Sequence, residues 1–243
     1  MRRCGIVVAL AVLACALMAS TAHAQSLAWR DEFSGTSVNT DTWWVYPSGL
    51  TTGGELATCS PSNVTLTGRG QLAITARKTG KGYTTGAMAS FLTSTYGTIQ
   101  ASIKLPAGQG LWPAFFAFGD DFSSVGWPAC GEMDVMENLG NDTHVVYGSV
   151  HAPGYDETTA ATSNADLAGG YHTYSVTWTP YQVRMALDGK PYVTYMPNMP
   201  AIFGQPFYVL FCLSVGGSWP GAPNATTRFP ATMLVDWVRA YNS

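Results

Sequence analysis

The sequence predicts an all-β protein built as an antiparallel sandwich or barrel, and three observations lead to that fold class. Many short segments alternate apolar and polar residues, which is the period of a strand with one buried face. The 26 glycines and 14 prolines of the 243-residue chain separate these segments. No stretch keeps an apolar period of about 3.6 residues over several turns, so no long helix is expected. Because no internal repeat or linker-like tract divides the chain, one domain is the economical interpretation.

The predicted strands follow one another from residue 64 onward. Residues 64–67 and 71–76 alternate around Gly68-Arg69-Gly70, as expected of a hairpin. Asp188-Gly189 is a strong signal for a second, tight hairpin. The full set of clear strand candidates is 64–67, 71–76, 96–105, 111–118, 133–137, 145–151, 171–178, 182–187, 192–195, 207–215 and 232–241.

Residues 1–24 have the layout of a secretory signal peptide. Two arginines give a positive start, residues 6–18 are almost wholly apolar, and Ala22-His23-Ala24 presents small residues where a signal peptidase reads them. A membrane anchor is the alternative, but the apolar run is short for a bilayer span. We therefore expect cleavage after Ala24 and a single secreted domain, extracellular or periplasmic, over residues 25–243.

The predicted domain is weakly acidic and rich in aromatic residues. Two of the 12 basic residues lie in the signal peptide. The predicted domain therefore has 10 Lys and Arg and 15 Asp and Glu, which gives a net charge of −5. This charge gives no electrostatic reason to bind nucleic acid or an acidic membrane. Charged residues make up 11% of the chain and aromatic residues 12%, a balance that suits an uncharged partner such as a polysaccharide. We expect the domain to be a monomer.

Three cysteines remain in the predicted domain: Cys59, Cys130 and Cys212. An oxidising compartment permits a disulfide, although the count is odd. Cys212 lies within the apolar run 207–215 and is expected to be a buried free thiol. Cys59 with Cys130 is then the more plausible pair. No Cys or His spacing resembles a zinc site.

Three acidic residues lie close together in the segment Gly131-Glu-Met-Asp-Val-Met-Glu-Asn138. Because strand side chains alternate between faces, Glu132 and Asp134 share a face and Glu137 points the other way. One extra residue at Val135-Met136, a β-bulge, would return Glu137 to the face of the other two acids. The spacing therefore predicts a bulged strand with three carboxylates on one surface.

Such a cluster is costly for stability, since like charges on one strand face repel. Glycoside hydrolysis uses this arrangement, because one carboxylate attacks the anomeric carbon while a second protonates the leaving oxygen and later activates water. A solvated acidic face and a calcium site are the alternatives, since clustered carboxylates also bind hard cations.

The segment resembles the Glu-x-Asp-x-x-Glu signature of glycoside hydrolase family 16, in the bulged form of its laminarinase-like members. The resemblance extends over nearly the whole predicted domain and follows the family's order of strands. The matching segments are Trp29-Arg-Asp-Glu-Phe33, residues 63–77, 96–106 and 110–115, Trp127-Pro-Ala-Cys-Gly-Glu132, residues 171–180, Ser214-Val-Gly-Gly-Ser-Trp-Pro220 and residues 233–241.

The resemblance implies an antiparallel β-jelly-roll sandwich with a concave substrate cleft and gives each acid a role. Glu132 would be the nucleophile, Asp134 an assisting acid and Glu137 the general acid and base, with no cofactor for catalysis. The further residues that the resemblance implies are His151 near the catalytic groups, Trp112, Trp127 and Glu55 on the substrate, and Glu32, Gly70 and Asp236 as ligands of a structural calcium. Trp219 follows Gly216-Gly217, which suits a loop at the rim of the cleft, so we expect it to contact the substrate as well.

The expected function is that of a secreted, retaining, endo-acting hydrolase of β-1,3-glucan such as laminarin. The chain departs from the family's pattern at the cleft walls: Gly54 precedes Glu55, Ala152 follows His151, and Phe116 stands where a Trp is usual. Ala201-Ile202-Phe203 also takes the place of a Trp that often precedes the Pro-Phe strand. These departures leave open a mixed β-1,3-1,4-glucan or a galactan as substrate. A glucan-binding protein without catalysis is a third alternative, although all three acids are present.

Overall fold

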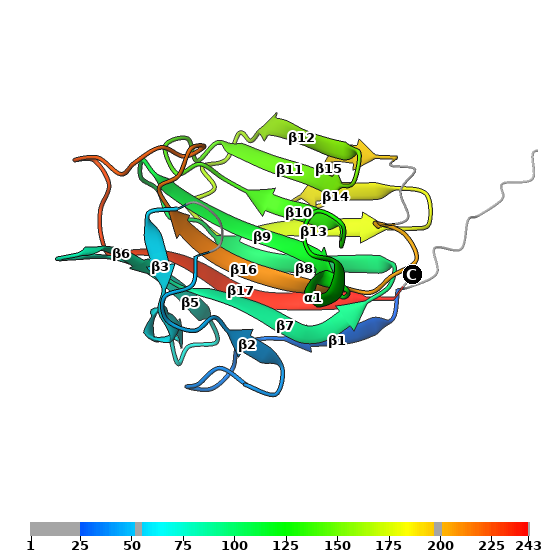
Figure 1. The fold of residues 1–243 in the computed structure, drawn as a ribbon, viewed down its shortest axis with the longest axis horizontal. Coiled ribbons are helices and arrows are strands. Elements are labelled where there is room, and N and C mark those ends of the chain that lie inside the picture. Colours follow the sequence, from blue (N-terminus) through cyan, green and yellow to red (C-terminus); the bar gives the residue numbers. More distant parts are fainter. Residues whose placement is uncertain (1–24, 52–54, 197–200, 243) are drawn as a thin grey trace, which may run out of the picture.

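The computed structural model describes residues 25–51, 55–196 and 201–242. Two sheets stack on each other, and almost all neighbouring strands are antiparallel (Figure 1). This arrangement confirms the predicted all-β sandwich. The predicted signal peptide lies outside the described residues. Within the described ranges, no helix is long and apolar enough to cross a membrane.

The first sheet has ten strands and carries the end of the described chain. Its main path runs β15-β14-β13-β8-β17-β5-β6-β3, while β1 pairs with β17 and β4 with β5. Its strands are β1 (Leu27–Asp31), β3 (Ala57–Cys59), β4 (Val64–Leu66), β5 (Leu72–Thr79), β6 (Gly82–Thr85), β8 (Gly97–Lys104), β13 (His172–Trp178), β14 (Val183–Leu187), β15 (Lys190–Tyr195) and β17 (Ala231–Tyr241).

The second sheet has seven strands in the order β12-β11-β10-β9-β16-β7-β2. A 3-10 turn, η1 (Pro61–Asn63), and one short helix, α1 (Phe122–Val125), complete the described secondary structure. The strands of this sheet are β2 (Trp43–Val45), β7 (Ala87–Ser94), β9 (Leu111–Gly119), β10 (Glu132–Glu137), β11 (Val145–Ala152), β12 (Tyr155–Thr162) and β16 (Phe207–Val215).

Both faces of the second sheet carry buried apolar side chains. On β9, Phe115 and Ala117 belong to the main core between the sheets. Ala114 and Phe116 alternate with them and belong to a smaller cluster that also holds Leu210. Since strand side chains alternate between faces, this smaller cluster lies on the outer face of the sheet. That face is the one on which the acidic residues of β10 are found.

Several local predictions agree with the structure. The hairpin around residues 68–70 pairs β4 with β5, and the Asp188-Gly189 turn joins β14 to β15. The strand candidates taken from alternation alone omitted β1, β2, β3, β6, β7 and β12, of which only β1 was covered by the family resemblance. The sequence of β7 is Ala-Met-Ala-Ser-Phe-Leu-Thr-Ser, which shows no clean alternation because small residues occupy both faces. The polar sequence of β12 suits its position at the edge of the sheet.

The predicted pairing of Cys59 with Cys130 is wrong. Cys59, Cys130 and Cys212 are all free and buried. Cys59 packs in the same outer-face cluster as Cys212, whereas Cys130 precedes β10 and its thiol donates to the carbonyl of Gly131. Burial raises the pKa of Cys59 and that of Cys130 to about 11, so both thiols stay protonated and unreactive at neutral pH. The prediction of a buried free thiol at Cys212 is confirmed.

Candidate active site

The strand β10 contains the predicted β-bulge. Asp134 pairs with Ser149 of β11 and with Phe116 of β9, and the register then shifts on both sides before Glu137. Val135 has no register partner in either neighbouring strand. Met133, Val135 and Met136 are fully buried in the core. The extra residue therefore returns Glu137 to the face of Glu132 and Asp134, as the spacing predicted.

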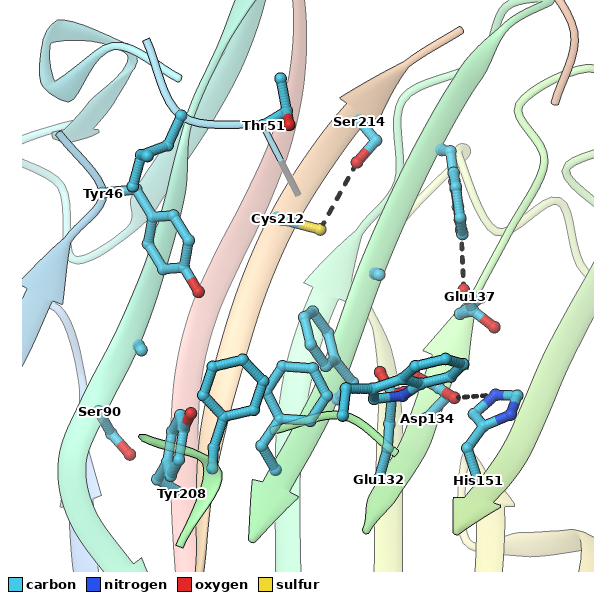
Figure 2. Close-up of a pocket in the computed structure, with 18 of the residues that line it drawn as sticks. Tyr46, Thr51, Ser90, Glu132, Asp134, Glu137, His151, Tyr208, Cys212 and Ser214 are labelled. Atoms are coloured by element: carbon cyan, nitrogen blue, oxygen red, sulfur yellow. Dashed lines mark hydrogen bonds and ion pairs between the residues drawn. The ribbon is translucent and has the colours of Figure 1, made fainter. Parts of the chain in front are cut away.

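A cleft of about 1450 Å³ lies over this face of the sheet. The acids of β10 point into the cleft from one strand and His151 from the next (Figure 2). The structure brings all eight predicted catalytic and substrate-binding residues to this cleft: Glu55, Trp112, Trp127, Glu132, Asp134, Glu137, His151 and Trp219.

Glu132 lies at the edge of the cleft beside Trp127. The indole Nε1 of Trp127 donates to Oε2 of Glu132 over 2.6 Å, and Asp134 shares a hydrogen bond with the same carboxyl group. Two carboxyl groups can share a hydrogen bond only when one of them holds a proton. Burial, and then the charge of Asp134, raise the pKa of Glu132 well above its usual range. Burial likewise raises the pKa of Asp134, with the charge of Glu137 as the second cause.

His151 extends this group of polar side chains toward solvent. Its Nε2 lies 3.1 Å from Oδ2 of Asp134 and its Nδ1 lies 2.7 Å from Oδ1 of Asp156. Asp156 is the direct cross-strand partner of His151 on β12, and its side chain is exposed. Sequence reasoning missed Asp156, although a hairpin between β11 and β12 would have placed it there. The ligand-type atoms of Glu132, Asp134 and His151 lie within 4.8 Å of one another.

Glu137 has a separate set of partners. The indole Nε1 of Trp112 donates to its Oε1 over 2.9 Å, and the hydroxyl of Ser149 lies 3.5 Å from its Oε2. Burial raises the pKa of Glu137 to about 7, while the bond from Trp112 opposes this rise and the charge of Glu132 adds to it. Glu137 can therefore hold a proton near neutral pH and release it when the negative charge of Glu132 is lost.

Aromatic rings frame the acids. Trp112 and Trp219 meet edge to face with ring centroids 5.3 Å apart, and Trp219 packs against Tyr147 in the same way at 4.9 Å. Trp127 is 56% exposed, so one of its faces is open to a ligand. Sequence reasoning missed other aromatic residues of the cleft, although residues of β9 at even positions from 112 to 118 share its face. These missed side chains are Trp44, Tyr46, Phe91, Phe118, Phe122, Tyr147 and Tyr208.

The far wall of the cleft contains Glu55, whose carboxylate Oε1 accepts a hydrogen bond of 2.9 Å from the hydroxyl of Ser214. Ser214 lies on β16, near Cys212 of the cleft floor (Figure 2). Gly54, the predicted departure beside Glu55, lies outside the described residues. Glu55 is therefore positioned as a polar group for a ligand that extends across the sheet from β10.

The three predicted calcium ligands lie apart from the cleft-lining residues, around the middle of β17. Register pairs Asp31 with Val238 and Leu72 with Val235, which brings Glu32, Gly70 and Asp236 into one neighbourhood. A side chain at Gly70 would lie 3.8 Å from the carbonyl oxygen of Glu32.

The side chain of Glu32 has a cation partner already. Arg239 donates to both of its oxygens, at 2.9 and 3.0 Å, and this bond lowers the pKa of Glu32. Only the main-chain carbonyl of Glu32 is then available to a metal. Together with the carboxylate of Asp236, the oxygen set fits the preference of calcium.

The chain is similar in sequence and in structure to known proteins. The sequence profile described as "Glycosyl hydrolases family 16" matches residues 55–239. A glucan endo-1,3-beta-glucosidase A1 from Niallia circulans is 33% identical over 89% of this chain. The matched region spans 38% of the length of that protein. A beta-glucanase from Rhodothermus marinus is 30% identical over 88% of this chain and 84% of its own length. The X-ray structure of an endo-beta-1,3-glucanase from Pyrococcus furiosus superposes with a TM-score of 0.83 at 36% identity, covering 89% of this chain and 94% of that one.

Proposed function

The chain belongs to glycosyl hydrolase family 16, and we propose that it is a retaining hydrolase that cleaves β-1,3-glucan at internal linkages. The observation that carries this proposal is the bulge in β10, which turns Glu132 and Glu137 toward one cleft while giving them different partners. A double displacement requires one ionised carboxyl group as the nucleophile and one protonated carboxyl group as the acid, both within reach of the same anomeric carbon.

In the first step, the carboxylate of Glu132 attacks the anomeric carbon and the bond to the leaving oxygen breaks. Glu137 donates its proton to that oxygen, which departs as the hydroxyl of the product. A covalent ester between the sugar and Glu132 results, and Glu132 loses its negative charge. Because that charge is among the causes that raise the pKa of Glu137, the pKa falls at this stage.

In the second step, Glu137 acts as a base. It takes a proton from water while the water oxygen attacks the anomeric carbon and the ester bond to Glu132 breaks. Two inversions give net retention of configuration. Asp134 assists by sharing a proton with Glu132, and His151 holds Asp134 from the next strand.

The cleft suits an uncharged sugar chain. Trp127 and Trp219 present exposed indole faces near the acids, and aromatic faces bury large areas of the apolar surface of a sugar ring. Glu55, on the far wall, would accept hydrogen bonds from sugar hydroxyls. The shape of the walls, where Phe116 replaces the usual Trp, is expected to decide between β-1,3 and mixed linkages.

Two further features belong to this proposal. The domain is secreted after removal of residues 1–24 and acts as a monomer, which N-terminal sequencing of the exported protein and size-exclusion chromatography would check. A structural calcium would be held by Asp236 and by the carbonyl oxygens of Glu32 and Gly70. When bound, this ion stabilises the sandwich and takes no part in the reaction.

The deciding assay is the release of new reducing ends from laminarin, run beside lichenan and agarose. Activity that is greatest on laminarin, with a rapid fall in chain length, supports the proposal. Greatest activity on lichenan or agarose would change the substrate to a mixed-linkage glucan or a galactan. Binding of glucan without hydrolysis of any of the three would favour a binding protein, and full activity of Glu132→Gln would remove Glu132 as the nucleophile.

A further inference from the structure

The bulged residue Val135 has a partner from the opposite sheet. Val135 has no register partner in either ladder of β10. The hydroxyl of Tyr192 donates to this carbonyl oxygen over 2.8 Å. Tyr192 lies on β15, an end strand of the ten-stranded sheet, so the bond crosses from one sheet to the other. A buried carbonyl without a partner would be costly, and Tyr192 removes that cost.

The absence of a side chain at Gly148 leaves space for the Tyr192 hydroxyl. A Cβ at Gly148 would lie 2.6 Å from this hydroxyl and 2.6 Å from Sδ of Met185. Gly148 lies on β11 between Tyr147, which pairs with Glu137, and Ser149, which pairs with Asp134 on the other side of the bulge. Any larger residue at position 148 would push the hydroxyl away from Val135.

The charges of Asp134 and Glu137 act on the same hydroxyl. Burial raises the pKa of Tyr192 well above its ordinary value, and the charges of Asp134 and Glu137 are among the further causes. Tyr192 therefore stays a neutral donor throughout the pH range in which the acids titrate. It does not line the cleft, so it acts on the site through the backbone of β10 rather than through the substrate.

We propose that Tyr192 is a positioning residue for catalysis, because its hydroxyl fixes the bulge at Val135 in the shape that aims Glu137 into the cleft. Without this bond the carbonyl of Val135 must turn to find another partner. The turn would rotate the peptide that precedes Met136 and displace the Glu137 side chain. This inference rests on the proposed function of Glu137.

The test compares Tyr192→Phe with Tyr195→Phe. Tyr195 is a matched control on the same strand, since its hydroxyl also reaches the opposite sheet, at the carbonyl of Gly148 over 2.8 Å, but misses the bulge. Tyr192→Phe is expected to lower kcat on laminarin about tenfold, which corresponds to about 1.4 kcal/mol, with KM changed less than about twofold. It is also expected to move the basic limb of the pH profile. Tyr195→Phe should lower the melting temperature and leave kcat and the pH profile within experimental error.

The inference fails if Tyr192→Phe keeps the wild-type kcat and pH profile, or if Tyr195→Phe loses as much kcat. Gly148→Ala is a second variant, because it keeps the tyrosine but displaces its hydroxyl; its kcat loss should not add to that of Tyr192→Phe. The kinetics are measured at a temperature at which circular dichroism shows that all variants are folded. If the wild-type protein hydrolyses no β-glucan, the proposed function fails separately. NMR titration of the Glu137 carboxyl carbon, compared between wild type and Tyr192→Phe, then decides whether the hydroxyl positions that side chain.

Discussion

Replacing Trp112 with Phe tests the assignment of Glu137 as the general acid. The change keeps an aromatic ring at the cleft but removes the N–H that donates to Oε1 of Glu137 over 2.9 Å. A hydrogen bond to a carboxylate favours the ionised form, and this bond is the largest of the causes that lower the pKa of Glu137. Its removal should therefore raise that pKa above its value of about 7.

The size of the shift follows from the strength of the bond. A hydrogen bond to a charged group contributes about 1.5–3 kcal/mol, and one pKa unit corresponds to about 1.4 kcal/mol. Complete loss would raise the pKa by about one to two units. Because Trp112 is half-buried at the cleft, water replaces part of the lost bond, so we expect a shift of about one unit.

The assay is kcat/KM for laminarin as a function of pH, which reports the ionisations of the free enzyme. The general acid must be protonated, so Trp112→Phe should move the basic limb upward by about one pH unit and leave the acidic limb in place. Trp127→Phe is the matched control, because its indole donates to Glu132, the proposed nucleophile. That variant should move the acidic limb upward instead. A basic limb that stays fixed or moves downward in Trp112→Phe would refute the assignment of Glu137.

Three further outcomes are expected. Because folding raises the pKa of Glu137 from 4.5 to about 7, the fold loses stability as pH rises from about 4.5 to about 7. Glu137→Gln should therefore add about 3 kcal/mol to the free energy of unfolding at pH 8.5 and almost nothing at pH 4, as measured by urea denaturation. Calcium at about 100 times its Kd should stabilise the protein by about 2.7 kcal/mol, with EDTA reversing the rise in melting temperature, and Asp236→Ala should abolish the effect. Since Cys59, Cys130 and Cys212 are free, a chain that starts at residue 25 should show three thiols when denatured without reductant, and reductant should not change its melting temperature.

The sequence by itself determined the fold class and the bulged shape of β10, which carries the three acids. Strand side chains have a period of two, so the spacing of Glu132, Asp134 and Glu137 requires an extra residue before the third acid can face the same way. The structure has that bulge. The hairpins at residues 68–70 and 188–189 were equally local, because a turn depends on the few residues that form it.

Features that depend on side-chain partners were decided only by the tertiary structure. The cysteine pairing was wrong because oxidising surroundings and spacing do not fix which sulfur atoms meet. The strand β7 was missed because its small residues give no alternation, although the sheet places it beside β16. Asp156 and Tyr192 carry no local signal of their roles.

The bond from Tyr192 to Val135 joins residues 57 positions apart and on different sheets. Periodicity is a property of neighbouring residues along one strand, so it predicts that the chain must bulge at Val135. Only the packing of two sheets decides which donor then satisfies the carbonyl that the bulge leaves without a partner, because that contact exists only after both sheets have formed.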